Sequence, residues 1–182
     1  MTNRMMMQAL TIAVTMAAPA LAQEKQEMPK PPPQVAEAAK GMGGTWKCKG
    51  TAHASPMGPE HKYEATMTWK QSPDKFWIVG NYAEKKSKEH PMAYKFTEYR
   101  TYDAKAGKWV ATHIAEMGSL LTGTGTGDAK AEDWTWKSVT TPMMPGEFHL
   151  TSTTKGNNEV ELKGEMIAPD GPKPAFVATC KK

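Results

Sequence analysis

Two histidines and one methionine recur at four-residue spacing in a short segment, as His53, Met57 and His61. Imidazole nitrogen and soft thioether sulfur are ligands that suit copper. The segment also contains two prolines and a glycine, which favour a loop, and in a loop this spacing fixes no common geometry. Solvated loop residues are therefore the favoured interpretation. We predict no metal site and keep these three residues as weak candidates for copper.

A second group combines aromatic side chains with one histidine. His113 lies an even number of residues after Trp109, so on a strand both side chains point to the same face. An inward His113 would be a ligand-binding donor or an acid/base group, and a structurally satisfied or outward histidine is the alternative. The residues expected to line an internal cavity are Tyr63, Trp69, Tyr82, Trp109, His113 and Trp136. A small barrel filled by its own side chains is the competing interpretation.

Other patterns give no catalytic prediction. The segment Gly123–Gly127 alternates Gly and Thr, but Lys130 does not directly follow a glycine and no strand–helix unit surrounds the segment, as a phosphate-binding loop requires. A flexible hairpin loop is expected there. The serines lack the context of a nucleophile elbow. The acids of 159–165 alternate with apolar residues, which is typical of a solvated strand face. We predict no catalytic residues and, on balance, no enzyme.

The elements that would position these side chains are mostly strands. Tyr63, Ala65, Met67 and Trp69 alternate with polar residues, which indicates a strand with one dry face. Turn-forming residues separate this strand from other short segments rich in aromatic and β-branched residues. The predicted strands are Thr45–Ala52, His61–Gln71, Phe76–Glu84, Met92–Tyr102, Lys108–Met117, Trp134–Thr140, Glu147–Thr154, Glu159–Ile167 and Pro174–Lys181.

The N-terminal region has a different character. Residues 1–22 have one arginine, an apolar run and Ala20-Leu21-Ala22 before Gln23, which predicts a cleaved export signal. A buried N-terminal helix is the alternative. Residues 23–33 form a Pro-rich leader, and a short helix with an apolar stripe at Val35, Ala38, Ala39 and Met42 should follow and end at Gly43. The domain boundaries predicted are 1–22, 23–33 and 34–182, with the protein periplasmic or secreted.

Charge and composition exclude several partners. The 182 residues carry 23 Lys+Arg against 19 Asp+Glu, a formal charge of +4, and arginine is scarce, which argues against nucleic acid. Beyond residue 22, no stretch approaches the roughly 18 apolar residues of a membrane span. The length suits one domain, expected to be a monomer, and no protein partner is identified.

Sequence-local hairpins favour a closed antiparallel up-and-down barrel of about nine to ten strands, with a sandwich as the alternative. Cys48 lies in the first predicted strand and Cys180 in the last, and closure makes those strands neighbours. A disulfide between the two cysteines would then lock the seam, in keeping with an oxidising compartment. Two unpaired thiols are the other interpretation.

The segment Gly43–Gly50 contains the Gly-x-Trp opening of lipocalin-like barrels, and the pieces Tyr102–Val110, Met117–Gly118 and Pro169–Gly171 follow in order. This ordered set resembles a bacterial family of secreted lipocalin-like barrels, a domain of unknown function, over roughly residues 35–182. The resemblance implies a calycin-type barrel with a helix plugging one end, and a structural role for Trp46 beneath that helix. It implies no activity.

The opening is also similar to that of nitrobindin-type haem barrels, which bind haem iron through a histidine near the C-terminus. No histidine follows His149, so we expect no cofactor.

From these patterns we expect an exported barrel that binds a small apolar or amphipathic ligand in its lumen. A filled barrel that acts through surface contacts with other proteins of the cell envelope is the main alternative, and copper binding is a minor one.

Overall fold

The computed structural model describes residues 28–182 except 56–57, 89–90, 92, 129 and 141–145. The predicted export signal and residues 23–27 of the predicted leader therefore lie outside the described residues. One helix, α1 (Pro33–Met42), precedes the strands, and a 3₁₀ turn, η1 (Glu116–Gly118), follows the fifth. The strands are β1 (Gly44–Ala52), β2 (His61–Gln71), β3 (Ile78–Glu84), β4 (Lys95–Asp103), β5 (Lys108–Ala115), β6 (Leu120–Gly127), β7 (Ala131–Thr140), β8 (Glu147–Gly156), β9 (Glu159–Ala168) and β10 (Gly171–Lys181).

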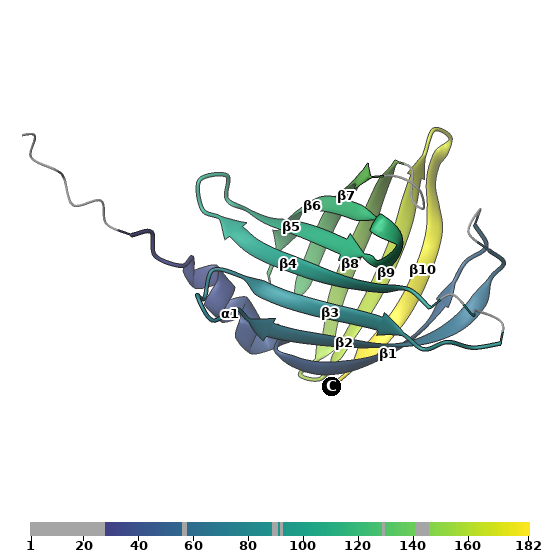
Figure 1. Ribbon diagram of the computed structural model, residues 1–182, viewed down its shortest axis with the longest axis horizontal. Coiled ribbons are helices and arrows are strands. Elements are labelled where there is room, and N and C mark those ends of the chain that lie inside the picture. The colour runs from purple at the N-terminus through teal and green to yellow at the C-terminus, as the bar shows by residue number, and fades with distance from the viewer. Residues whose placement is uncertain (1–27, 56–57, 89–90, 92, 129, 141–145) are drawn as a thin grey trace, which may run out of the picture.

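The ten strands form a closed, antiparallel up-and-down barrel (Figure 1), which confirms the predicted fold class. Each strand pairs with the next in sequence, and β1 also pairs with β10. In that last pairing Cys48 is directly opposite Cys180, and the two form a disulfide across a sequence separation of 132 residues. The predicted covalent seam is therefore present. Within the described residues, no helix has the length and apolarity needed to cross a bilayer.

Helix α1 covers one end of the barrel. Pro33 occupies its first turn, where the missing N–H costs nothing, and Gly43 caps its end, as predicted. Val35 is fully buried, and the rest of the predicted apolar stripe packs against the core. Trp46 lies beneath the helix and donates its indole N–H to the carbonyl oxygen of Met42 at 2.7 Å. Lys182, which directly follows β10, donates from Nζ to the carbonyl oxygen of Gly41 at 3.1 Å. Helix α1 is therefore bonded both to β1 and to the end of the chain after β10.

The segment predicted to be a flexible hairpin loop is strand β6, so that prediction is wrong. Inward positions 123 and 125 are glycines because the rings of Trp136 and Trp134 on β7 lie against them. A Cβ atom at either glycine would come within 2.6 Å of the nearest ring atom. Gly80 on β3 gives the same space to Trp69 on β2. The alternation of Gly and Thr is thus a strand pattern in which glycine faces the lumen and threonine faces solvent.

The disulfide should dominate the response of the barrel to reductant. In the chain-entropy model, closing a loop of this length lowers the entropy of the unfolded chain enough to stabilise the fold by about 5 kcal/mol. Urea unfolding with dithiothreitol should therefore give a free energy of unfolding lower by up to about 5 kcal/mol than unfolding without it. The Cys48→Ser/Cys180→Ser variant is the control, because its unfolding should not respond to reductant. An unchanged wild-type midpoint would contradict the prediction.

The glycines of β6 should tolerate no side chain. Gly125→Ala forces a methyl group against the ring of Trp134, and such overpacking typically costs about 1–3 kcal/mol. The exposed neighbour Thr124 provides the matched control, since Thr124→Ala should change the free energy of unfolding by less than about 0.5 kcal/mol. Equal urea midpoints for the two variants would show that the ring contact is not what constrains position 125.

Candidate ligand site at the open end of the barrel

The two halves of the barrel interior differ in exposure. In the half covered by α1, the large inward side chains of Trp46, Trp69, Ile78, Trp109 and Trp134 are buried. Toward the other end, inward-facing apolar side chains keep part of their surface accessible, although strand alternation points them into the lumen. These half-buried residues are Tyr63, Tyr82, Phe96, Phe148, Met166 and Phe176. The tryptophan rings next to α1 are therefore the most completely buried, and we call that part of the interior the filled half and the part toward the other end the open half.

The floor of the open half is built around His113. Its Nε2 atom shares a 2.9 Å hydrogen bond with the hydroxyl of Tyr94, and its ring stacks on Phe96 at a centroid distance of 3.7 Å. The ring of Trp136 contacts it edge-on at 5.8 Å. Burial, together with the positive charge of Arg100, lowers the pKa of His113 to about 4. The imidazole is therefore neutral at physiological pH and is both a donor and an acceptor of hydrogen bonds.

Three tyrosine hydroxyls and one carboxylate lie above this floor. Tyr82 donates to Glu84 Oε1 at 2.9 Å, and the backbone N–H of Tyr94 donates to Glu84 Oε2 at 2.9 Å. Burial raises the pKa of Tyr94 to about 12. Burial and then the charge of Glu84 also raise the pKa values of Tyr63 and Tyr82. All three phenols therefore keep their protons and are neutral polar groups.

A buried ionic cluster lies among the tryptophans. The guanidinium of Arg100 bonds to Glu98 through Nε and to Glu132 Oε2 through Nη1 at 2.9 Å. Its two faces are covered by the rings of Trp69 and Trp134, each with its centroid 4.5 Å from Cζ. Burial raises the pKa of Glu98, and the charge of Arg100 opposes that shift. Because its partners and both faces are occupied, Arg100 is a structural cation and not a site for a ligand anion.

Sequence analysis did not find this cluster. Glu98 and Arg100 are two residues apart on β4, so they share a face, and Arg100 is the only arginine of the chain apart from Arg4. The scarcity of arginine and the glutamate on the same strand face could have indicated an ion pair of Arg100 with Glu98. They do not reveal Glu132, which comes from β7 and reaches Arg100 through the fold.

The six residues predicted to line a cavity all point inward, but they fall into different parts of the lumen. Trp69 and Trp109 pack within the filled half, Trp69 against Arg100 and Trp109 against Tyr102. His113 and Trp136 form the floor of the open half. Tyr63 and Tyr82 stand near its mouth. The structure thus places four of the six in the half away from α1 and two next to α1.

The two described copper candidates, His53 and His61, each have a partner at Nδ1. His53 Nδ1 is 3.1 Å from Glu60 Oε2, and His61 Nδ1 is 3.0 Å from the carbonyl oxygen of Pro59. Met57 lies outside the described residues. Both contacts involve Nδ1 and are compatible with either interpretation, since a metal-bound imidazole commonly donates its other N–H to a carboxylate or carbonyl. In the part of the chain that the structure describes, no group of three His, Cys, Asp or Glu side chains is placed to hold a metal ion.

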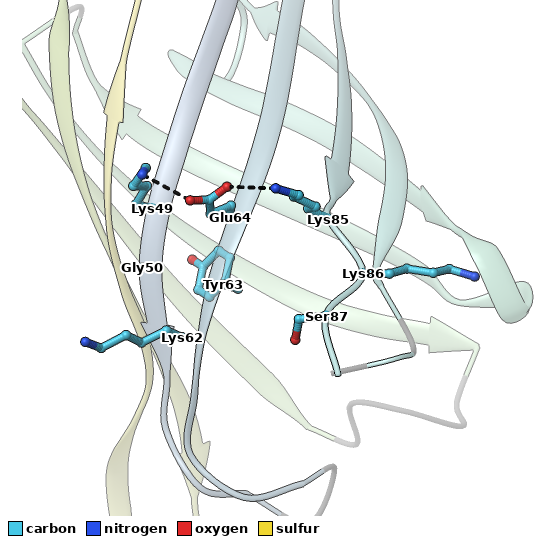
Figure 2. Close-up of a pocket in the computed structure, with 8 residues that line it drawn as sticks. All are labelled: Lys49, Gly50, Lys62, Tyr63, Glu64, Lys85, Lys86 and Ser87. Carbon is cyan, nitrogen blue, oxygen red and sulfur yellow. Dashed lines mark ion pairs between the residues drawn. The ribbon is translucent and has the colours of Figure 1, made fainter. Parts of the chain in front are cut away.

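One pocket of about 400 Å³ lies at this end of the barrel (Figure 2). Its walls come from β1, β2 and the segment that follows β3. The lining residues are Lys49, Gly50, Lys62, Tyr63, Glu64, Lys85, Lys86 and Ser87. Tyr63 belongs to both the pocket and the lumen, because its ring also contacts inward-facing Phe176 edge-on at 6.5 Å. The pocket volume falls within the range of about 300–1,000 Å³ that small-molecule sites occupy.

Residues 33–180 match the model of a family described as a protein of unknown function, DUF1579. This chain belongs to that family. Among solved structures, it is similar to Rv2717c from M. tuberculosis, with a TM-score of 0.64 and 11% sequence identity over 81% of this chain and 96% of that one. At this identity the likeness shows a shared fold alone. No curated protein sequence matches the chain.

The buried His113 should make the stability of this DUF1579 barrel depend on pH. Its folded-state pKa of about 4 lies below the ordinary 6.5, so between those values the unfolded chain binds a proton that the folded protein does not. The stability that depends on neutral His113 is complete above pH 6.5 and falls by about 3 kcal/mol as the pH drops to 4.

Urea unfolding of wild type and His113→Gln across this range tests the assignment. The free energy of unfolding of wild type relative to the variant should decrease as the pH falls from 6.5 to 4. His149→Gln, which removes a more exposed imidazole, controls for the loss of a histidine elsewhere. Parallel curves for wild type and His113→Gln would show that His113 titrates normally.

Proposed function

We propose that this barrel binds a small apolar or amphipathic ligand in the open half of its lumen. The observation that supports it is the set of inward-facing apolar side chains that remain half-buried, among them Phe148, Met166 and Phe176. The tryptophan rings next to α1, by contrast, are buried, as at Trp46, Trp109 and Trp134. Partly exposed apolar and aromatic side chains are the usual lining of a small-molecule site.

The energetics are compatible with useful affinity. Burying about 400 Å² of combined apolar surface stabilises a complex by about 10 kcal/mol, against association costs of at least about 4 kcal/mol. The difference of at most about 6 kcal/mol corresponds to a Kd of tens of micromolar. The hydroxyls of Tyr63, Tyr82 and Tyr94 and the imidazole of His113 would then orient the ligand rather than provide most of the affinity.

Export is part of the same proposal. The disulfide between Cys48 and Cys180 supports an oxidising compartment, since such bonds rarely persist in the cytosol. A periplasmic or secreted location would also fit the predicted signal at residues 1–22. Fractionation of the source cells, with the mature N-terminus determined by mass spectrometry, tests this point.

The alternative is a barrel that acts through its outer surface on another envelope protein. Trp77 and Tyr99 favour it, because they form an outward edge-to-face pair at 6.5 Å and are 38% and 39% exposed. Lumen-blocking substitutions should leave such a function unaffected, whereas Trp77→Ser should remove it.

Blocking the open half should abolish ligand binding. Met166→Trp places a large ring at a half-buried inward position, and Ile114→Trp places the same ring on the outside of β5, where the side chain is 50% exposed. With the uncharged fluorophore N-phenyl-1-naphthylamine as probe, wild type and Ile114→Trp should bind with equal affinity. Met166→Trp should bind about tenfold more weakly, since the ring occupies the space of the probe.

Circular dichroism confirms that each variant is folded, and Met166→Phe replaces Met166→Trp if the larger ring prevents folding. Saturable binding that Met166→Trp leaves intact, or no binding by wild type, would refute a ligand site in the lumen.

A further inference from the structure

The rim of the 400 Å³ pocket is strongly basic. Four of its lining residues are lysines, Lys49, Lys62, Lys85 and Lys86, and Glu64 is its one acid. Glu64 lies between Lys49 and Lys85, with Nζ–Oε distances of 3.0 and 3.6 Å. Figure 2 shows these three side chains in a row, with Lys62 and Lys86 extending to opposite sides of the pocket. Among the described residues, neither Lys62 nor Lys86 has an acidic partner at ion-pair distance.

The pocket lies where the wall of the barrel opens. Pairing between β2 and β3 begins at Ala65 opposite Glu84, so the first residues of β2 have no β3 partner. One bond, from the backbone N–H of Lys85 to the carbonyl oxygen of Glu64 at 2.8 Å, closes the seam at that point. On the other side of β2, the ring of Tyr63 lies over Gly50 of β1, where a Cβ atom would meet it at 2.8 Å. Tyr63 is therefore the wall shared by the pocket and the open half of the lumen.

The lumen itself offers no place for an anion. Its one guanidinium in the described part of the chain, that of Arg100, is held by Glu98 and Glu132. Glu84 adds a further carboxylate near the mouth. Because Glu98 and Glu132 both bond to Arg100, this guanidinium is not available to an anion. An anionic group would instead be attracted by the lysines of the rim.

We propose that the ligand of this barrel is an amphipathic anion, such as an aromatic or alkyl carboxylate, sulfonate or phosphate. Its apolar part enters the open half of the lumen past Tyr63, and its anionic group stays at the rim among Lys49, Lys62, Lys85 and Lys86. This inference rests on the proposed function, because it assigns the chemical class of the ligand to the same site. It also gives Glu64 a role, since its carboxylate holds Lys49 and Lys85 in place and competes with the ligand for them.

Two probes that differ by one charge test the inference. N-phenyl-1-naphthylamine is uncharged, and 8-anilinonaphthalene-1-sulfonate has the same ring system with an added sulfonate. Wild type should bind the sulfonate more tightly than the neutral probe. Lys62→Gln/Lys86→Gln should weaken sulfonate binding by roughly fivefold and leave neutral-probe binding unchanged, since exposed charge pairs contribute up to about 1 kcal/mol each.

Glu64→Gln provides the opposite change. It removes the competing carboxylate and should strengthen sulfonate binding by about twofold to threefold with no effect on the neutral probe. A gain of affinity of this kind does not result from damage to the fold. The difference between the two probes should also shrink as salt is raised, because the Debye length falls from about 10 Å at 0.1 M to about 3 Å at 1 M.

The matched control is Lys70→Gln/Lys163→Gln, which removes two exposed lysines on the outer faces of β2 and β9. It should change neither affinity. If the neutral probe binds and Met166→Trp blocks it, but sulfonate binding is insensitive to Lys62→Gln/Lys86→Gln, the lumen site stands and the anion proposal is wrong. If Met166→Trp affects neither probe, the lumen site and the anion proposal both fail.

Discussion

The tryptophan rings inside this barrel require glycine on the neighbouring strand. Trp69 lies against Gly80, Trp136 against Gly123 and Trp134 against Gly125, each with a ring atom less than 3 Å from where a Cβ would stand. Rings packed this closely occupy much of the lumen, with Trp69 and Trp134 next to α1 and Trp136 beside His113. Protein interiors are dense enough that little space remains between such groups. The glycines therefore decide where a large ring can lie inside the barrel, and Gly50 and Gly164 do the same for Tyr63, Phe148 and Phe176.

The same packing determines where charge is held. Arg100 lies between two indole rings, so its guanidinium is removed from water and needs partners that compensate the lost hydration. Glu98 and Glu132 provide them, and the N–H of Trp134 also bonds to Glu132 at 3.1 Å. A buried pair of this kind costs about 3–5 kcal/mol when one partner is removed. Positive charge available to a ligand is consequently found outside the lumen, on the lysines of the rim.

Much of the fold could be predicted from the sequence because its signals are local. Helix α1 and strand β2 have strong apolar periods, and the predicted bounds of β2, His61–Gln71, are those observed. The disulfide followed from closure of the barrel, since closure makes the first and last strands neighbours. Strand β6 was missed because glycine is a weak strand former and usually marks a turn. Its inward glycines make sense only beside the tryptophans of β7.

The site was less accessible to such reasoning. Strand parity correctly placed His113 on the face of Trp109. Residues 76–82, however, have apolar side chains on both faces, so the sequence did not show which face of that segment points inward. The structure shows Ile78 and Tyr82 inward and Trp77 outward just before β3. The contact of Glu132 with Arg100 joins residues 32 apart on β7 and β4. The partial burial of Phe148 and Phe176 depends on which side chains of other strands reach them inside the barrel, and no local sequence pattern contains that information.

The seam and the pocket are coupled through one strand. Cys48 and Gly50 are two residues apart on β1, so they share its inward face, and the disulfide ties that strand to β10 just beside the ring of Tyr63. The β1 side of the pocket is thus covalently held in position. The opposite side is formed by Lys85–Ser87, which the structure joins to β2 by the bond from Lys85 to Glu64. The two sides of the pocket are therefore held differently, the β1 side by the covalent closure of the barrel and the side of Lys85–Ser87 by a backbone hydrogen bond.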